Sequence, residues 1–290
     1  MHFSIHYVTE YHYAAPVSDN LNALRVRPAT TAHQRCDEFH VRVDPETRLG
    51  RHSDYFGTEV IEFGISRPHS ELTIDVRARV VTSEPPEPPD PDWEALSSPA
   101  YLEAAGEYLL ASIPLPPPGS LNEFESIVQA SSPLQSALAL CEVIPTRFAY
   151  RRGITYVGST VADLLDIGAG VCQDFVHLAL ILLRRSGIAS RYVSGYLFAA
   201  ASDGSDDSVE VDTHAWLEVL LPGGGGRGEP IWVGLDPTNR TATGERYVKI
   251  GHGRHYDDVP PIKGVYRGGR AQLSARVLMT RLDPQTTARA

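Results

Sequence analysis

The chain has 290 residues, a length that suggests two domains or one large domain with an appendage. Its 26 basic and 36 acidic residues give a net charge of −10 without any block of lysine and arginine, which excludes nucleic acid and anionic membrane surfaces as primary partners. No apolar stretch approaches the roughly 20 residues needed to span a bilayer. The N-terminal residues lack a signal-peptide pattern, and three cysteines at wide spacings fit a reducing compartment, so a cytoplasmic protein is expected.

Residues 1–84 contain several runs in which apolar and polar side chains alternate, the pattern typical of half-buried strands. The clearest runs cover residues 3–7, 39–43 and 72–80. Turn-forming pairs such as Asp44-Pro45 separate the runs, so the pattern predicts a small antiparallel, sandwich-like β domain. Proline occupies five positions of the following stretch EPPEPPDP and favours an extended backbone, so residues 85–91 are expected to form a linker.

The pattern changes after the linker to the period of a helix. One candidate helix covers residues 93–111, and a second begins at Pro133, a residue type that suits the first helical position. Ser132 and Gln135 have the spacing of a capping box, and the helix is expected to end before Pro145.

Two of the three cysteines have simple interpretations. Cys141 shares one face of the second candidate helix with Leu134 and Leu138, so it is expected to be a small buried hydrophobic residue. Cys36 lies in the polar stretch HQRCDEF, without metal-ligand spacing or a nearby base, and no chemical role is expected for it.

Cys172 lies where a glycine-rich turn runs into an apolar helix, in the sequence GAGVCQDFVHLALILLRRSG. The unpaired N–H groups and the positive dipole end of a helix N-terminus stabilise an anion, so this position favours a reactive thiolate. Gly168 and Gly170 are expected to leave room for a substrate. On this segment alone, a buried structural cysteine remains the alternative.

Two predicted strands downstream supply a base and a carboxylate. The first strand begins at Thr213-His214, and the second, over residues 231–235, ends at Asp236. If the strands pair antiparallel, the start of one and the end of the other share an edge, and Asp236 can orient the imidazole of His214. Each residue taken singly is more often structural, but with Cys172 they have the types that thiol-based acyl transfer needs.

Four blocks of the sequence resemble the bacterial transglutaminase-like superfamily, whose members are cysteine acyl-transfer enzymes with a papain-like α+β core. These blocks are Gly170-Val171-Cys172-Gln173-Asp174-Phe175 with His177-Leu178, residues 191–197 (RYVSGYL), His214-Ala215-Trp216, and residues 232–239 (WVGLDPTN). Residues 1–84 are similar to the N-terminal domain of such proteins, and residues 92–290 to their catalytic domain, with a C-terminal extension from about residue 253. The resemblance therefore covers nearly the whole chain and implies an α+β fold.

The resemblance assigns the nucleophile to Cys172, the general base to His214 and the orienting carboxylate to Asp236. Gln173 and Trp216 are candidates for contacts to the oxyanion or the substrate. The implied activity is acyl transfer from a peptide or amide to water or an amine, on a peptide or protein substrate, without a cofactor or metal. A catalytically silent relative that binds proteins or peptides is the alternative.

Two further segments have competing interpretations. Residues 223–228 match G-x-G-x-x-G, but a strand follows them where a dinucleotide site needs a helix, so a hairpin loop is expected. Residues 203–212 are rich in aspartate and lack the spacing of an EF-hand, which leaves either a cation site or a polar loop that shapes access to the active site.

Overall fold

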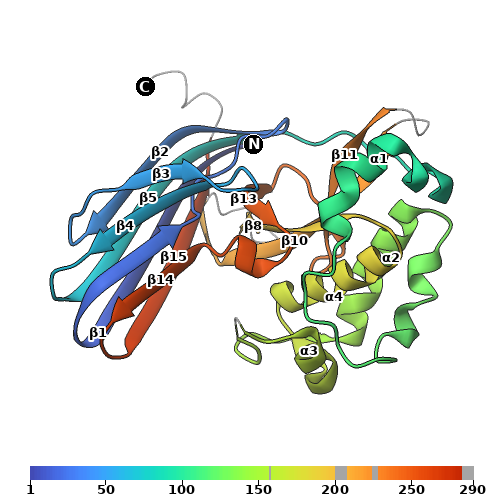
Figure 1. The fold of residues 1–290 in the computed structure, drawn as a ribbon. Coiled ribbons are helices and arrows are strands. Elements are labelled where there is room, and N and C mark those ends of the chain that lie inside the picture. The colour runs from blue at the N-terminus through green and yellow to red at the C-terminus, as the bar shows by residue number, and fades with distance from the viewer. Residues whose placement is uncertain (157, 200–207, 224–227, 283–290) are drawn as a thin grey trace.

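The computed structural model describes residues 1–156, 158–199, 208–223 and 228–282, which form two large sheets, a two-stranded sheet and a group of helices (Figure 1). The first sheet contains β1 (His2–Leu24), β2 (Gln34–Asp44), β3 (Gly50–Ser53), β4 (Glu59–Ile65), β5 (His69–Thr82), β9 (Ser208–Val211), β14 (Ile262–Arg267) and β15 (Ala271–Arg281). The second contains β8 (Ser190–Leu197), β10 (Thr213–Gly223), β11 (Gly228–Asp236), β12 (Thr241–Ala242) and β13 (Tyr247–Gly253). The α-helices are α1 (Pro99–Ala105), α2 (Pro133–Arg147), α3 (Val161–Ile167) and α4 (Cys172–Arg185).

The long strand β1 organises the first sheet. Its first part pairs with β5 and β15, and residues 18–24 pair with β4 and β14, all antiparallel. The predicted alternation is confirmed here, because Phe3, Ile5 and Tyr7 are buried on one face of β1. The predicted α+β class with an antiparallel N-terminal sheet is therefore the fold that the chain adopts.

The C-terminal strands lie beside the N-terminal ones, although nearly the whole chain separates them. β15 pairs with β1 from Phe3↔Arg281 to Tyr13↔Ala271, and β14 pairs with its later part. Val277 and Met279 of β15 join the same buried cluster as the strands of residues 1–84. The expected catalytic unit, residues 92–290, thus contributes strands to the N-terminal sheet, because hydrogen bonding covers an edge that β1 would otherwise expose.

The second sheet has the order β12-β11-β10-β8-β13, and each of its two faces packs against a different partner. One face meets the helices, with α4 against β8 and β10 (Figure 1). On the other, Tyr196, Val248 and Ile250 join the buried cluster of the N-terminal sheet. Within the described ranges, no helix is long and apolar enough to cross a membrane.

The predicted helix over residues 93–111 is wrong in extent. The structure has the 3₁₀ helices Trp93–Ser97 and Gly106–Leu109 on either side of the short α1, which begins at Pro99. Proline lacks an N–H and suits the first turn of a helix, and Ser98 caps α1 by accepting from the amide of Tyr101. A new helix therefore starts at Pro99, where the apolar periodicity predicted one continuous helix.

The helix predicted from Pro133 is confirmed as α2, with two corrections. Ser132 caps it through the amide of Gln135, but the Gln135 side chain donates to Asp90 in the proline-rich segment instead of closing a capping box. The helix also continues past Pro145 to Arg147. Pro145 lacks the N–H that would donate to the carbonyl oxygen of Cys141, but Phe148 still donates to that of Ile144, so the helix ends only after the proline.

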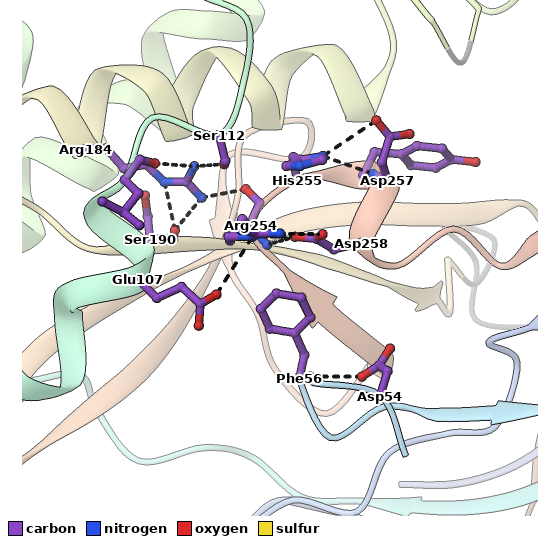
Figure 2. Close-up of polar contacts among 12 residues, drawn as sticks. Asp54, Phe56, Glu107, Ser112, Arg184, Ser190, Arg254, His255, Asp257 and Asp258 are labelled. Carbon is purple, nitrogen blue, oxygen red and sulfur yellow. Dashed lines mark hydrogen bonds and ion pairs between the residues drawn. The ribbon is translucent and has the colours of Figure 1, made fainter. Parts of the chain in front are cut away.

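The C-terminal end of α4 is anchored by a buried arginine (Figure 2). Arg184 donates to the carbonyl oxygen of Ser190 from Nε and Nη2, to that of Arg254 at 2.6 Å and to the hydroxyl of Ser112 at 2.8 Å. These contacts tie α4 to the start of β8 and the end of β13. They fix the axis of the helix that carries Cys172 at its other end.

Candidate active site

Cys172 is the first residue of α4, as the sequence predicted, and its side chain is partly exposed. The amides of Asp174 and Phe175 donate to the carbonyl oxygen of Val171. The amides of Cys172 and Gln173 have no hydrogen-bond partner among the described residues. Two N–H groups and the positive end of the helix dipole are therefore available beside the sulfur.

Asp174 holds this helix start in place. Its carboxylate accepts from the amide of Val171 at 2.8 Å and from the hydroxyl of Thr155 at 2.7 Å. A Cβ on Gly170 would lie 2.8 Å from that carboxylate, so the missing side chain makes room for Asp174. Gly168 ends α3 with φ of 71°. Both glycines thus shape the turn before Cys172, and the expectation that they make room for a substrate stays a prediction.

His214 and Asp236 come together at one edge of the second sheet. β10 and β11 pair antiparallel, with Leu217 opposite Leu235. His214 stands near the start of β10 and Asp236 is the last residue of β11, so their side chains meet, with 2.7 Å between His214 Nε2 and Asp236 Oδ2. Cys172 approaches the same imidazole from α4 and interacts with it electrostatically.

The Asp236 carboxylate is fully buried and accepts several hydrogen bonds besides that of His214. Tyr247 donates its hydroxyl at 2.8 Å, Asn239 donates its side-chain amide at 2.6 Å, and the amides of Thr238 and Asn239 donate to Oδ1. Burial alone would raise the pKa of Asp236, but these donors and His214 hold it below its usual value. Asp236 is therefore a buried carboxylate stabilised in its charged form.

The imidazole of His214 is stabilised in its charged form as well. Burial alone would lower its pKa, but hydrogen bonding to Asp236 and the interaction with Cys172 raise it to about 9. At neutral pH the ring is an imidazolium between the Asp236 carboxylate and the sulfur of Cys172. Such a ring can stabilise a thiolate and later release a proton to a leaving group.

Tyr247 and Asn239 are the supporting residues that sequence reasoning missed. Tyr247 begins β13, which pairs with β8 and is separated from β11 by two strands, and its hydroxyl nevertheless reaches Asp236. No periodicity in the sequence predicts the pairing of β13 with β8. Asn239 follows Asp236 by three residues, a spacing at which a side-chain amide can fold back onto a turn carboxylate.

Trp216 is buried, so its indole is not at the surface where a substrate could contact it. The ring instead packs 6.2 Å from the His214 ring and 5.3 Å from that of Tyr247. A Cβ on Gly195 would lie 2.5 Å from the indole, so glycine is what lets Trp216 lie over β8. Gln173, in contrast, is partly exposed beside Cys172, where it can face a substrate.

An exposed ion pair spans the two sides of the site. Arg152 follows β6 (Ala149–Tyr150), which pairs with β7 (Ala169–Gly170) just before Cys172. Asp212 immediately precedes β10, and its carboxylate lies 2.7 Å from Arg152 Nη1. Of the acidic stretch, Glu210 lies on β9, whereas Asp203, Asp206 and Asp207 lie outside the described residues, as do residues 224–227 of the glycine run.

Within the described ranges, no group of three or more His, Cys, Asp and Glu side chains is arranged to hold a metal ion. The acidic residues near the site have other partners. Asp212 pairs with Arg152, and Asp174 accepts from a backbone amide and a threonine hydroxyl.

His177, also on α4, lies apart from this cluster and its ring is buried. Nε2 accepts from the amide of Tyr256 at 3.2 Å, and burial with the charges of His255 and Arg184 lowers its pKa to about 3. An unfolded histidine has a pKa near 6.5, so below that pH unfolding takes up a proton. The neutral ring contributes stability above pH 6.5 that is lost as the pH falls toward 3.

We expect His177→Gln to weaken the acid sensitivity of the fold. In the wild type this histidine makes the free energy of unfolding fall by up to about 1.4 kcal/mol per pH unit below pH 6.5. Glutamine does not titrate and keeps an acceptor for the Tyr256 amide. Urea unfolding between pH 7 and 4.5 measures the slope, with the exposed His40→Gln as the control. An unchanged slope in His177→Gln would show that His177 is charged in the folded protein.

Comparison with known proteins places this geometry in a family. Residues 3–81 match the family model described as the bacterial transglutaminase-like N-terminal region, and residues 124–237 match that of the transglutaminase-like superfamily. An uncharacterised protein of Mycobacterium leprae is 35% identical over 278 residues, covering 94% of this chain and 96% of that protein. An uncharacterised protein of Mycobacterium tuberculosis is 36% identical over 269 residues, covering 89% of this chain and 85% of that protein.

Two further matches are to proteins named for an activity. A protein-glutamine gamma-glutamyltransferase of Pseudomonas aeruginosa is 28% identical over 130 residues, covering 42% of this chain and 19% of that protein. The crystal structure of a proposed cysteine protease from Cytophaga hutchinsonii has a TM-score of 0.74 at 22% identity, covering 98% of this chain and 91% of that chain, and so shares the fold. The chain belongs to the transglutaminase-like superfamily, with the N-terminal region typical of its bacterial members.

Proposed function

We propose that the chain is a cysteine-dependent acyl-transfer enzyme that acts on peptide or side-chain amide bonds through a thioester on Cys172. The observation that carries the proposal is the contact between His214 and the buried Asp236 carboxylate, beside a thiol at a helix start. Membership of the transglutaminase-like superfamily supports it. The glutamyl transfer named for the Pseudomonas aeruginosa relative makes glutamine side chains candidate substrates.

In the proposed reaction, the Cys172 thiolate attacks the carbonyl carbon of the amide. The amides of Cys172 and Gln173, with the Gln173 side chain, stabilise the negative charge on the carbonyl oxygen. The His214 imidazolium protonates the departing amine as the C–N bond breaks, which leaves a thioester. His214 then removes a proton from water or from an amine, which attacks the thioester. The C–S bond breaks, the acyl group leaves as an acid or a new amide, and the Cys172 thiolate and the His214 imidazolium are restored.

Asp236 and its neighbours position the base. Asp236 fixes which His214 nitrogen carries a proton toward the carboxylate, so that the other faces the sulfur. Tyr247 and Asn239 hold the carboxylate, and Trp216 limits the tilt of the ring. We further propose a cytoplasmic location, because all three cysteines are free thiols.

The experiment that tests the proposal incubates the protein with a mixed peptide library, with and without a primary amine, and measures product masses. Amine adducts identify a transferase, and cleaved or deamidated peptides identify a hydrolase. The Cys172→Ala variant must abolish either product. A wild-type protein that leaves every peptide unchanged in both arms would overturn the proposed activity.

Thiol labelling separates an enzyme from a catalytically silent binding protein. We expect iodoacetamide at neutral pH to modify Cys172 at least about 10-fold faster than the other thiols, because His214 favours its thiolate. Burial raises the pKa of both Cys36 and Cys141, which keeps them as thiols. His214→Ala should remove most of the difference, as read by mass spectrometry of labelled peptides. Equal rates at the three cysteines would favour the binding protein.

A further inference from the structure

A cavity of about 420 Å³ lies between the N-terminal sheet and the second sheet, lined by residues from both. One side is formed by residues 27–31 and by the turn between β3 and β4. The other is formed by Arg191 of β8 and residues 249–252 of β13. Phe56, which Figure 2 shows reaching from that turn toward Arg254, also lines the cavity.

Two cations share one carboxylate on the second-sheet side of the cavity. Lys249 Nζ lies 2.7 and 2.8 Å from the two oxygens of Glu218, and Arg191 Nε lies 2.6 Å from one of them. All three side chains are largely buried, at 11 to 13% exposed. The Arg191 guanidinium also stacks 3.9 Å from the centre of the Trp232 ring, which fixes its plane. One positive charge in this cluster has no negative partner.

On the N-terminal-sheet side of the cavity, cations again outnumber carboxylates. Glu59 accepts from Arg27 Nη1 at 2.6 Å and lies 3.4 Å from Arg51 Nη1. Arg27 and Glu59 line the cavity. Three cations, Arg27, Arg191 and Lys249, thus line the cavity with one carboxylate, Glu59, in a chain whose net charge is −10. Arg191 and Lys249 have little access to water, so the positive excess on their side is costly unless an anion offsets it.

His252 adds a neutral donor to the same wall. Its Nε2 lies 3.0 Å from Arg191 Nη1, and a guanidinium can only donate, so Nε2 accepts. Burial and the charges of Lys249 and Arg191 lower its pKa to about 3, so the ring is neutral and carries its proton on Nδ1. The hydroxyls of Thr30, Thr31 and Thr58 complete a polar lining.

We propose that this cavity binds the oxyanion group, phosphate or carboxylate, of a small organic molecule. The cations supply the charge, the histidine and threonine groups supply further hydrogen bonds, and the volume exceeds what a single inorganic ion fills. The ligand would contact both sheets, so its binding would hold the N-terminal strands against the sheet that carries His214 and Asp236. The site is separate from Cys172 and does not rest on the proposed acyl transfer.

The test measures binding of inorganic phosphate and, in a separate arm, of acetate to the full chain by calorimetry. Sodium chloride keeps the ionic strength constant, because exposed charge interactions are screened by salt. We expect saturable binding of at least one of the two anions, and the preferred one tells a phosphate-bearing ligand from a carboxylate-bearing ligand. Absence of saturable binding of both would overturn the proposal.

Two variants with opposite expected effects separate binding from damage to the fold. Arg27→Gln removes a cation and should weaken binding about 10-fold, whereas Glu59→Gln removes an anion and should tighten it several-fold. If the substitutions acted only by disturbing the packing between the two sheets, both Arg27→Gln and Glu59→Gln would weaken binding. Arg48→Gln, at an exposed arginine that lines a different groove, is the matched control and should leave affinity unchanged. Weaker binding in Glu59→Gln, or equal effects of Arg27→Gln and Arg48→Gln, would overturn the proposal.

Discussion

Replacing Cys172 with serine is expected to lower kcat/KM for the peptide substrate by at least about 10⁴-fold. A serine hydroxyl is far less acidic than a thiol, so the His214 imidazolium cannot hold it as an anion. The helix-start amides and Asp236 remain in place, so the loss measures the nucleophile and not the fold. The rate is read from product mass on the peptide that the library identifies.

Two controls use the other cysteines of the chain. Cys36→Ser should leave kcat/KM unchanged, because Cys36 lies on β2, in a different sheet from His214. Cys141→Ala should lower the unfolding temperature, since that side chain of α2 is packed in the core. If Cys172→Ser retains more than about a tenth of the activity, another group is the nucleophile.

The elements that could be predicted are those encoded in local patterns. Alternation of apolar and polar residues predicted β1, β2 and β5, and the glycine turn followed by an apolar run predicted α4. Both patterns depend on side chains only a few residues apart. The pairing of Phe3 with Arg281 depends on residues at opposite ends of the chain. No local pattern carries that information, so the C-terminal strands were placed with the catalytic unit.

The candidate site divides in the same way. Cys172, His214 and Asp236 each stand at the end of a recognisable element, and antiparallel pairing of two consecutive strands brings the last two together. Tyr247 reaches Asp236 only through the order β11-β10-β8-β13, which the sequence does not specify locally. Trp216 could be named from its sequence block, but its burial depends on β13 and on the absence of a side chain at Gly195.

Replacing Asp236 with asparagine is expected to lower kcat/KM by about 10⁴-fold while the fold persists. An asparagine side chain can turn its amide toward His214 Nε2, which forces the proton onto the nitrogen that should face the sulfur. It also removes the negative charge that offsets the imidazolium. Tyr247→Phe is the matched comparison, because it removes one donor to the carboxylate and keeps the charge, and about a 10-fold loss is expected.

The pH profile distinguishes an orienting carboxylate from a merely structural one. Hydrogen bonding to Asp236 is among the causes that raise the pKa of His214 to about 9, so activity that needs the imidazolium should decline above that pH. In Asp236→Asn the raising influence is gone, and the alkaline limb should move to lower pH. In Tyr247→Phe the Asp236 carboxylate loses a competing hydrogen-bond donor and stabilises the imidazolium at least as well as in the wild type. The pH at which activity declines on the alkaline side should therefore not fall. An alkaline limb that stays fixed in Asp236→Asn would show that Asp236 does not control the protonation of His214.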